Sequence, residues 1–289
     1  MVGVAALMIA ALVAGCQGGD DDRDDGGNVA GGPSHSYVAL GDSAVAGAGI
    51  GPGEGPCFRS SRNYPSLLAQ SLKLADDQFV DVSCPGATTK DVLDGRQKPT
   101  PLDPQVDAIG PDTDLVTISI GGNDSGYIPA LFTYCYLPPT RSDAACQKTL
   151  DALPQLLPGI KQAIAKTLTE IAERAPKAQV VLVSYLRLTP DNGACAASTV
   201  PGPAAQLRAG ARAEGQLEKA MREAADEADV SYVSMRDASA DHSACATDDP
   251  WASGITAAAG DGSSLHPNAA GMQAVADKVL SSINIDATN

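Results

Sequence analysis

Residues 115–124 read LVTISIGGND, an apolar run that stops abruptly in a glycine-rich polar loop. A short run of this kind, bounded by turn residues, predicts a strand that is buried on both faces. The run YVAL at 37–40 has the same character and is followed by Gly41, Asp42 and Ser43. Two strands that end in polar loops indicate a parallel sheet whose carboxyl edge carries a ligand site.

The rest of the chain alternates strands with helices. Apolar segments at 79–83, 180–185 and 230–235 have the length and composition of further strands. Helical spacing of apolar residues and prolines in first turns predict helices between the strands. The segments expected to be helical are 64–75, a short helix from 88 or 89, most of 145–174, 206–229 and 267–283. This order predicts an α/β chain with about five parallel strands, covered by helices on both faces.

The chain of 289 residues is strongly acidic and poor in aromatic residues. It holds 20 Lys and Arg against 35 Asp and Glu, a net charge of −15, and only 4% of its residues are aromatic. Such a charge repels phosphate backbones, which excludes nucleic acid as a partner. The length and apolar content allow one domain of catalytic size.

The N-terminal part differs in composition from the rest. Residues 1–14 form an apolar run of signal-peptide length, too short to span a membrane, and lead into VAGC, which is similar to a bacterial lipobox and ends at Cys16. We expect a lipoprotein signal at 1–16, a disordered acidic Gly/Asp tether at 17–35 and one folded domain at 36–289. The protein is then exported as a cell-membrane lipoprotein whose contact with the membrane is the lipid on Cys16. Plain secretion is the alternative.

Six cysteines follow Cys16, an even number that suits disulfides in an oxidising compartment. None of them forms a C-x-x-C pair, and no histidine lies at ligand spacing beside a cysteine cluster, so we expect no metal site. The sequence leaves the pairing open, and we favour bonds between neighbours. The expected disulfides are Cys57–Cys84, Cys135–Cys146 and Cys195–Cys245.

Four blocks of the sequence resemble the motifs of the GDSL, or SGNH, family of serine esterases and lipases. The first, YVALGDSAVAG at 37–47, is similar to the nucleophile block, although Ala44 stands where the family has a larger residue. The others, which are similar to the glycine, asparagine and histidine blocks, are CPGATT at 84–89, IGGND at 120–124 and LHPNAAG at 265–271. They follow the order of the family, and the likeness is closest to its secreted, three-disulfide actinobacterial members.

The resemblance implies a three-layer, doubly wound, flavodoxin-like SGNH hydrolase domain that cleaves carboxylic esters without a cofactor. It implies Ser43 as the nucleophile, His266 as the base, and an oxyanion hole from the N–H groups of Ser43 and Gly86 and the side-chain amide of Asn123. Lipid or other acyl esters are the expected substrates. The alternatives are a carbohydrate acetylesterase or acyltransferase on the same fold, or a noncatalytic acyl-binding lipoprotein.

The residue types also suit this chemistry by themselves. A serine hydroxyl needs a base to take its proton near neutral pH, and an imidazole with a pKa of about 6.5 is suited to that role. Of the three histidines, His35 lies in the tether, His242 lies in a polar loop near Cys245, and only His266 lies at a loop-to-helix junction. We therefore expect His266 to be the base.

The sequence leaves open which group orients His266. The family commonly has Asp three residues before the histidine, where this chain has Ser263. Asp261 can reach the ring if Gly262 lets the loop fold back. Alternatively, a backbone carbonyl, with that of Ser263 as first candidate, accepts the ring N–H, and we favour this dyad. We further expect a monomer, with the pocket lined by loops at 125–147 and 186–203.

Overall fold

A five-stranded parallel sheet forms the centre of the structure, a computed structural model that describes residues 36–96 and 101–284. All neighbouring strands are parallel, as predicted. In spatial order the strands are β4 (Phe79–Asp81), β1 (Tyr37–Gly41), β5 (Leu115–Ser119), β6 (Gln179–Val183) and β7 (Ser231–Val233). The register of β1 and β5 aligns Gly41 with Ser119, so the loops that follow these two strands lie next to one another.

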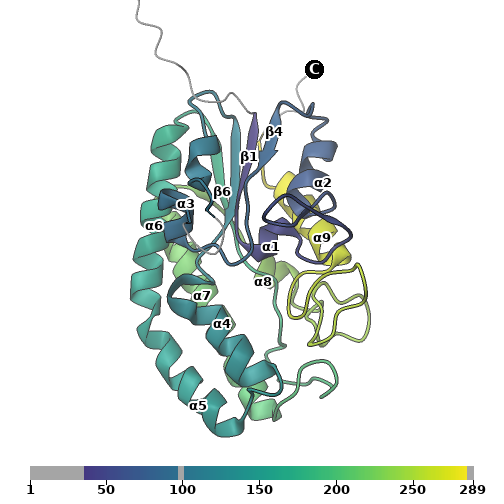
Figure 1. Ribbon diagram of the computed structural model, residues 1–289. Helices are drawn as coiled ribbons and strands as arrows, with labels where there is room; N and C mark the ends of the chain where they lie inside the picture. The colour runs from purple at the N-terminus through teal and green to yellow at the C-terminus, as the bar shows by residue number, and fades with distance from the viewer. Residues whose placement is uncertain (1–35, 97–100, 285–289) are drawn as a thin grey trace, which may run out of the picture. The chain divides into compact units, whose positions relative to one another are not determined.

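Helices cover both faces of this sheet (Figure 1). On one face lie α2 (Tyr64–Ser71) and α9 (Ala269–Leu280), which contact one another. On the other face lie α3 (Thr89–Asp94), α6 (Leu157–Arg174) and α7 (Ala204–Glu227). The predicted three-layer, doubly wound α/β fold is therefore confirmed.

Two hydrophobic cores, one on each face, explain why the central strands are apolar throughout. Tyr37 and Ala39 of β1 belong to the core under α2 and α9, whereas Val38 and Leu40 belong to the core under α6 and α7. Every residue of β1 and β5 is buried. A strand covered on both sides has no solvent face on which polar residues could alternate.

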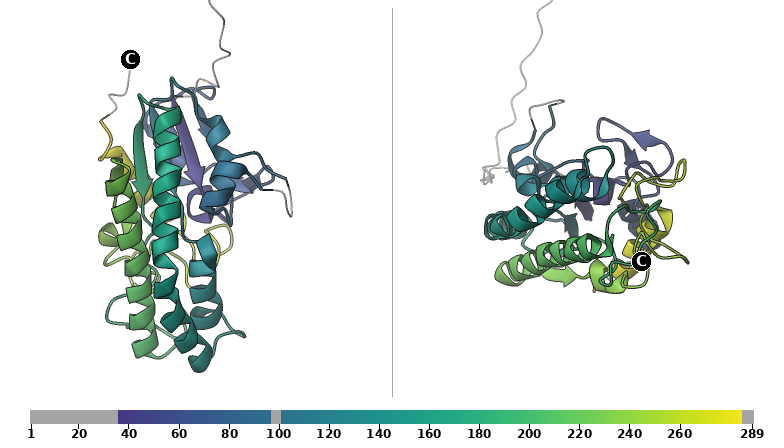
Figure 2. Two further views of the ribbon diagram at one scale, coloured as in Figure 1. Left: turned by 90° about the vertical axis from the view of Figure 1, so that its left-hand side faces the viewer. Right: turned by 90° about the horizontal axis from the view of Figure 1, so that it is seen from below.

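A helical extension continues beyond the carboxyl edge of the sheet (Figures 1 and 2). It contains α4 (Tyr127–Leu131), the π-helical turn η3 (Phe132–Tyr136) and α5 (Asp143–Ala152), which contact one another. The long helix α7 contacts η3 and α5, and it accepts a hydrogen bond from Tyr127 of α4. Residues 125–147 were expected to be a loop, and that expectation is wrong for most of them. Ser142, whose side chain caps α5, was the overlooked start signal.

The remaining elements are short and lie in the connections between the main strands and helices. They are α1 (Ser43–Ala46), α8 (Met235–Ala238), the hairpin strands β2 (Gly53–Glu54) and β3 (Arg59–Ser60), and the 3₁₀ turns η1 (Gln105–Ala108), η2 (Asp124–Gly126) and η4 (Leu153–Gln155).

Three disulfides join the expected neighbours, with Cα–Cα distances of 4.8, 4.5 and 5.0 Å for Cys57–Cys84, Cys135–Cys146 and Cys195–Cys245. The predicted signal, Cys16 and the tether lie outside the described residues. Within residues 36–96 and 101–284, no helix is long and apolar enough to cross a membrane. The same residues contain no cluster of His, Cys, Asp or Glu that could hold a metal ion.

Candidate active site

The turn after β1 presents Ser43 at the start of α1. Gly41 has a φ of +135°, and a Cβ there would collide with the carbonyl of Ser119, so glycine is required. The side chain of Gln105 bonds to both backbone groups of this glycine. The N–H of Gly41 donates to Oε1 of Gln105 at 2.8 Å, and Nε2 of Gln105 donates to the carbonyl of Gly41 at 3.0 Å. Asp42 caps α1 by accepting a hydrogen bond from the N–H of Ala44 at 2.9 Å.

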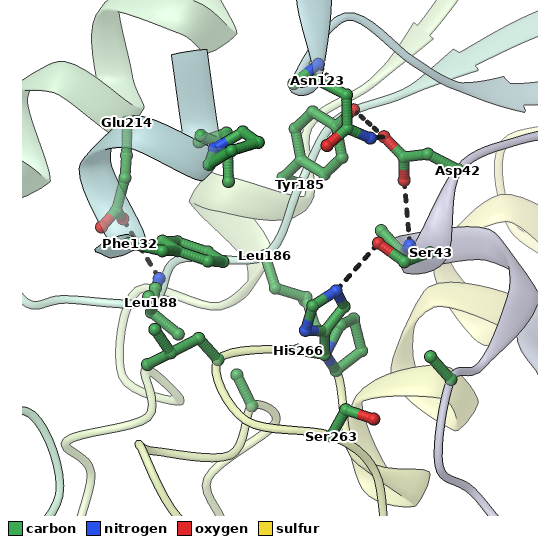
Figure 3. Close-up of a pocket in the computed structure, with 18 of the residues that line it drawn as sticks. Asp42, Ser43, Asn123, Phe132, Tyr185, Leu186, Leu188, Glu214, Ser263 and His266 are labelled. Atoms are coloured by element: carbon green, nitrogen blue, oxygen red, sulfur yellow. Dashed lines mark hydrogen bonds between the residues drawn. The ribbon is translucent and has the colours of Figure 1, made fainter. Parts of the chain in front are cut away.

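The structure brings Ser43 and His266 together from opposite ends of the chain. The hydroxyl oxygen of Ser43 lies 2.8 Å from Nε2 of His266 (Figure 3). Nδ1 of the same ring lies 2.8 Å from the backbone carbonyl of Ser264. A carbonyl can only accept, so Nδ1 carries the proton and Nε2 is left as the acceptor for the serine hydroxyl.

The orienting group is thus Ser264, and neither Ser263 nor Asp261 takes that place. The carbonyl of Ser263 accepts the backbone N–H of His266 at 3.2 Å, so it is already engaged. A carboxylate oxygen of Asp261 accepts the N–H of Ala269 at 2.9 Å and holds the start of α9. Leu265, between Ser264 and His266, has a φ of +58°, so the chain makes a left-handed turn at the point where the Ser264 carbonyl contacts the ring.

Burial favours the neutral form of the His266 ring. Loss of solvent around the ring lowers the pKa of His266, and the hydrogen bond to Ser264 opposes this effect only in part. The ring of Phe132 lies edge-on to the imidazole, with centroids 6.4 Å apart, and contributes to its apolar surroundings. His242, by contrast, stacks on Trp251 in the loop before Ser253 and lies outside the pocket.

Two backbone N–H groups near Ser43 are free to bind an anion. Among the described residues, the N–H groups of Ser43 and Gly86 have no hydrogen-bond acceptor. Gly86 has a φ of +76°, and no atom lies within 4 Å of where its Cβ would be, so its backbone is open to a ligand. The Asn123 side chain is less free, since Nδ2 donates to the carbonyl of Ala87 at 3.0 Å and to Asp42 at 3.3 Å.

Tyr185, which lies two residues beyond β6, bonds to Asp42 and Gly122 beside the active site. It was not predicted as a site residue from the sequence. Its hydroxyl donates to Oδ2 of Asp42 at 2.6 Å and accepts the N–H of Gly122 at 2.9 Å. Burial raises the pKa of Asp42 to about 6, although the bonds from Tyr185 and Ala44 oppose that rise. The available signal was the position of Tyr185 at the carboxyl end of an expected strand, where ligand sites gather.

A cavity of about 420 Å³ extends from Ser43 into the helical extension. Figure 3 shows Glu214 on the side of this cavity opposite Ser43, with Phe132 and Leu186 between them and Leu188 beside Glu214. The other apolar lining residues include Ile128, Pro129, Leu217 and Leu265. Segments 125–147 and 186–203 therefore do contribute to the pocket, as expected.

The far end of the cavity carries paired charges. Arg236 lies 3.3 Å from Glu214 and 3.8 Å from Glu218. Glu214 also accepts hydrogen bonds from the N–H of Leu188 and the hydroxyl of Thr189, at 3.1 and 2.8 Å. These groups satisfy one another, so the end of the cavity is polar but has no unpaired charge to offer a ligand.

The comparison with known families settles what kind of protein has this site. Residues 39–274 match the model of the GDSL-like Lipase/Acylhydrolase family. The chain belongs to this family. It is 32% identical over 274 residues to lipase 2 of Streptomyces coelicolor, an alignment that covers 88% of each chain. It is 36% identical over 167 residues to a lipase of Streptomyces rimosus, covering 55% of this chain and 56% of that one.

Solved structures agree with this assignment. An extracellular lipase from Streptomyces rimosus is 28% identical, with a TM-score of 0.73, and the match covers 86% of this chain and all of that one. A phospholipase A1 from Streptomyces albidoflavus has the same identity and coverage, with a TM-score of 0.72. The protein is accordingly a carboxylic ester hydrolase with the SGNH fold that the four sequence blocks implied.

Proposed function

We propose that the protein hydrolyses lipid or other acyl esters through an acyl-enzyme on Ser43. The observation that carries this proposal is the 2.8 Å contact between the Ser43 hydroxyl and the unprotonated Nε2 of His266. This geometry lets the hydroxyl oxygen attack the ester carbonyl while its proton passes to His266. The alkoxide leaving group then takes that proton and departs as the alcohol.

A second half-reaction regenerates the enzyme. Water attacks the acyl-serine and gives a proton to His266, and the proton returns to the Ser43 oxygen as the carboxylic acid leaves. In both steps the tetrahedral oxyanion is stabilised by the free N–H groups of Ser43 and Gly86, with Asn123 as the third donor. The Ser264 carbonyl keeps the ring in one tautomer and stabilises the imidazolium less than a carboxylate would.

The cavity supports acyl esters over sugar acetates. The side chains of Phe132, Leu186 and Leu188 line the cavity that begins at Ser43. They offer an apolar surface to an alkyl chain. An acetyl group would leave most of this surface uncovered. The fold shared with a phospholipase A1 supports glycerolipid esters as substrates.

The test is hydrolysis of p-nitrophenyl esters from acetate to palmitate, followed by release of fatty acid from phosphatidylcholine vesicles. We expect Ser43→Ala and His266→Ala to abolish turnover, and the matched control His242→Ala to retain it. Activity that survives Ser43→Ala would refute the serine mechanism. Binding of acyl esters without turnover by the folded parent would favour the noncatalytic alternative.

We also propose export, with the domain at 36–289 held to the membrane by lipid on Cys16 through the tether at 17–35. The three disulfides support an oxidising compartment. Expression in a bacterium with lipoprotein processing should place the parent in the membrane fraction and release Cys16→Ala from it. Equal distribution of the two proteins would contradict lipid attachment.

A further inference from the structure

Tyr185 connects two of the turns at the active site, although it lies outside all four family-like blocks of the sequence. Tyr185 follows β6, yet its hydroxyl contacts the Asp42 carboxylate at 2.6 Å and the N–H of Gly122 at 2.9 Å. It therefore links the turn that carries Ser43 to the turn that carries Asn123.

Asp42 uses both carboxylate oxygens in this network. Oδ1 accepts the N–H of Ala44, and Oδ2 accepts both the Tyr185 hydroxyl at 2.6 Å and the Asn123 amide at 3.3 Å. The Tyr185 bond is short and well within the normal range, whereas the Asn123 bond is long and weak. Tyr185 is thus the principal partner of the buried Oδ2.

This division of partners bears on the oxyanion hole. The two amide hydrogens of Asn123 point to Ala87 and Asp42, so a bond to the oxyanion must replace one of them. The longer bond, to Asp42, is the one that costs least to give up. It can be given up only if Oδ2 keeps another donor, since an unpaired buried carboxylate oxygen is costly.

We propose that Tyr185 is a positioning residue that holds Oδ2 of Asp42, and so frees an amide hydrogen of Asn123 for the oxyanion. This inference rests on the proposed function, because it assigns Asn123 to the oxyanion hole of the Ser43 reaction. Without the Tyr185 hydroxyl, Asp42 has only Asn123 as a donor to Oδ2 and draws the amide away from the substrate.

The Tyr185 side chain packs directly against Gly122, which leaves no room for a larger residue there. A Cβ at this position would lie 2.9 Å from the Tyr185 oxygen, closer than a side-chain carbon normally approaches. The same Cβ would lie 3.0 and 3.2 Å from two ring carbons, so Gly122→Ala should displace the tyrosine ring together with its hydroxyl. Tyr185→Phe and Gly122→Ala should thus both remove the hydrogen bond between the Tyr185 hydroxyl and Asp42.

The test compares Tyr185→Phe with Tyr127→Phe in the full chain. Tyr127 is a buried tyrosine at the start of α4 whose hydroxyl donates to the carbonyl of Ala213 in α7 at 2.9 Å and makes no bond to Asp42 or Gly122. Outright loss of one oxyanion donor lowers kcat by about 10²- to 10³-fold, so the indirect loss in Tyr185→Phe should lower kcat roughly 10- to 100-fold. We expect KM to change little and Tyr127→Phe to keep the kcat of the parent.

A double-mutant cycle with Asp42→Asn separates positioning from a general loss of structure. Asparagine still caps α1 but replaces the Oδ2 acceptor with a donor, so the effect of Tyr185→Phe should shrink to less than about threefold in this background. An undiminished effect, or a kcat of Tyr185→Phe within about twofold of Tyr127→Phe, would overturn the inference.

Two controls keep the result interpretable. If Tyr185→Phe does not fold, Gly122→Ala takes its place in the cycle, with the same expected fall in kcat and the same refuting result. Ser43→Ala is measured alongside, because turnover that survives it refutes the serine mechanism itself. Loss of turnover in Ser43→Ala together with a normal kcat in Tyr185→Phe refutes only the role of Tyr185.

Discussion

The Cys195–Cys245 disulfide closes the longest of the three covalent loops, and Cys195→Ala/Cys245→Ala removes it. Its sequence separation is 50 residues, compared with 11 for Cys135–Cys146. Loop-closure entropy in the unfolded chain then gives about 4.1 kcal/mol at 25 °C for the long loop and about 2.8 kcal/mol for the short one. We expect the long-loop variant to lose about 1.3 kcal/mol more unfolding free energy than Cys135→Ala/Cys146→Ala.

Urea unfolding of both variants and the parent measures this difference. Circular dichroism follows the helices, and fluorescence of the single tryptophan, Trp251, follows the region near Cys245. Coincident transitions are required for the comparison of free energies. A short-loop variant that is destabilised as much as the long-loop variant, or more, would refute the argument from chain entropy.

The same disulfide also bears on catalysis, because the segment after Cys245 holds the His266 loop. Ser253 donates its N–H to the carbonyl of His266 at 2.9 Å, and Leu265 donates its N–H to the carbonyl of Gly254 at 2.9 Å. Cys195→Ala/Cys245→Ala should therefore lower kcat at temperatures where it remains folded. An unchanged kcat would show that these backbone bonds hold the loop without the disulfide.

Other predictions follow from single side chains. The lowered pKa of His266 should place the acid midpoint of kcat/KM below pH 6.5, and a midpoint above it would contradict a buried neutral ring. Asn123→Ala should lower kcat by about 10²- to 10³-fold with a small change in KM, and an unchanged kcat would remove it from the oxyanion hole. The pKa of Asp42, raised in the folded state to about 6, means that stability falls as pH rises from 4 to 7, relative to Asp42→Asn in urea titrations. Ser263→Asp should leave the pH profile of kcat/KM unchanged, because that side chain lies against Gly49 and not against the ring.

The sequence predicted the strands and the meeting of their loops because both depend on local patterns. Apolar runs such as 115–120 end in polar turns, and a parallel sheet brings those turns to one edge. The helical nature of 127–136 escaped prediction because Pro129 and aromatic residues mask a helical pattern there, and packing on α7 decides it. The Ser264 carbonyl also could not be predicted, since it contacts His266 next to Leu265, whose left-handed conformation its residue type does not indicate.

Ser263 stands three residues before His266, so no carboxylate from that position stabilises the protonated ring. A carboxylate beside Nδ1 would raise the pKa of the imidazole, whereas the neutral Ser264 carbonyl leaves burial as the dominant effect and the pKa falls. A lower pKa favours the basic form of the histidine, but it makes the imidazolium a less stable intermediate. In the proposed mechanism, the donors to the oxyanion must then supply more of the transition-state stabilisation, so the direction of the Asn123 amide and the groups that set it become more important.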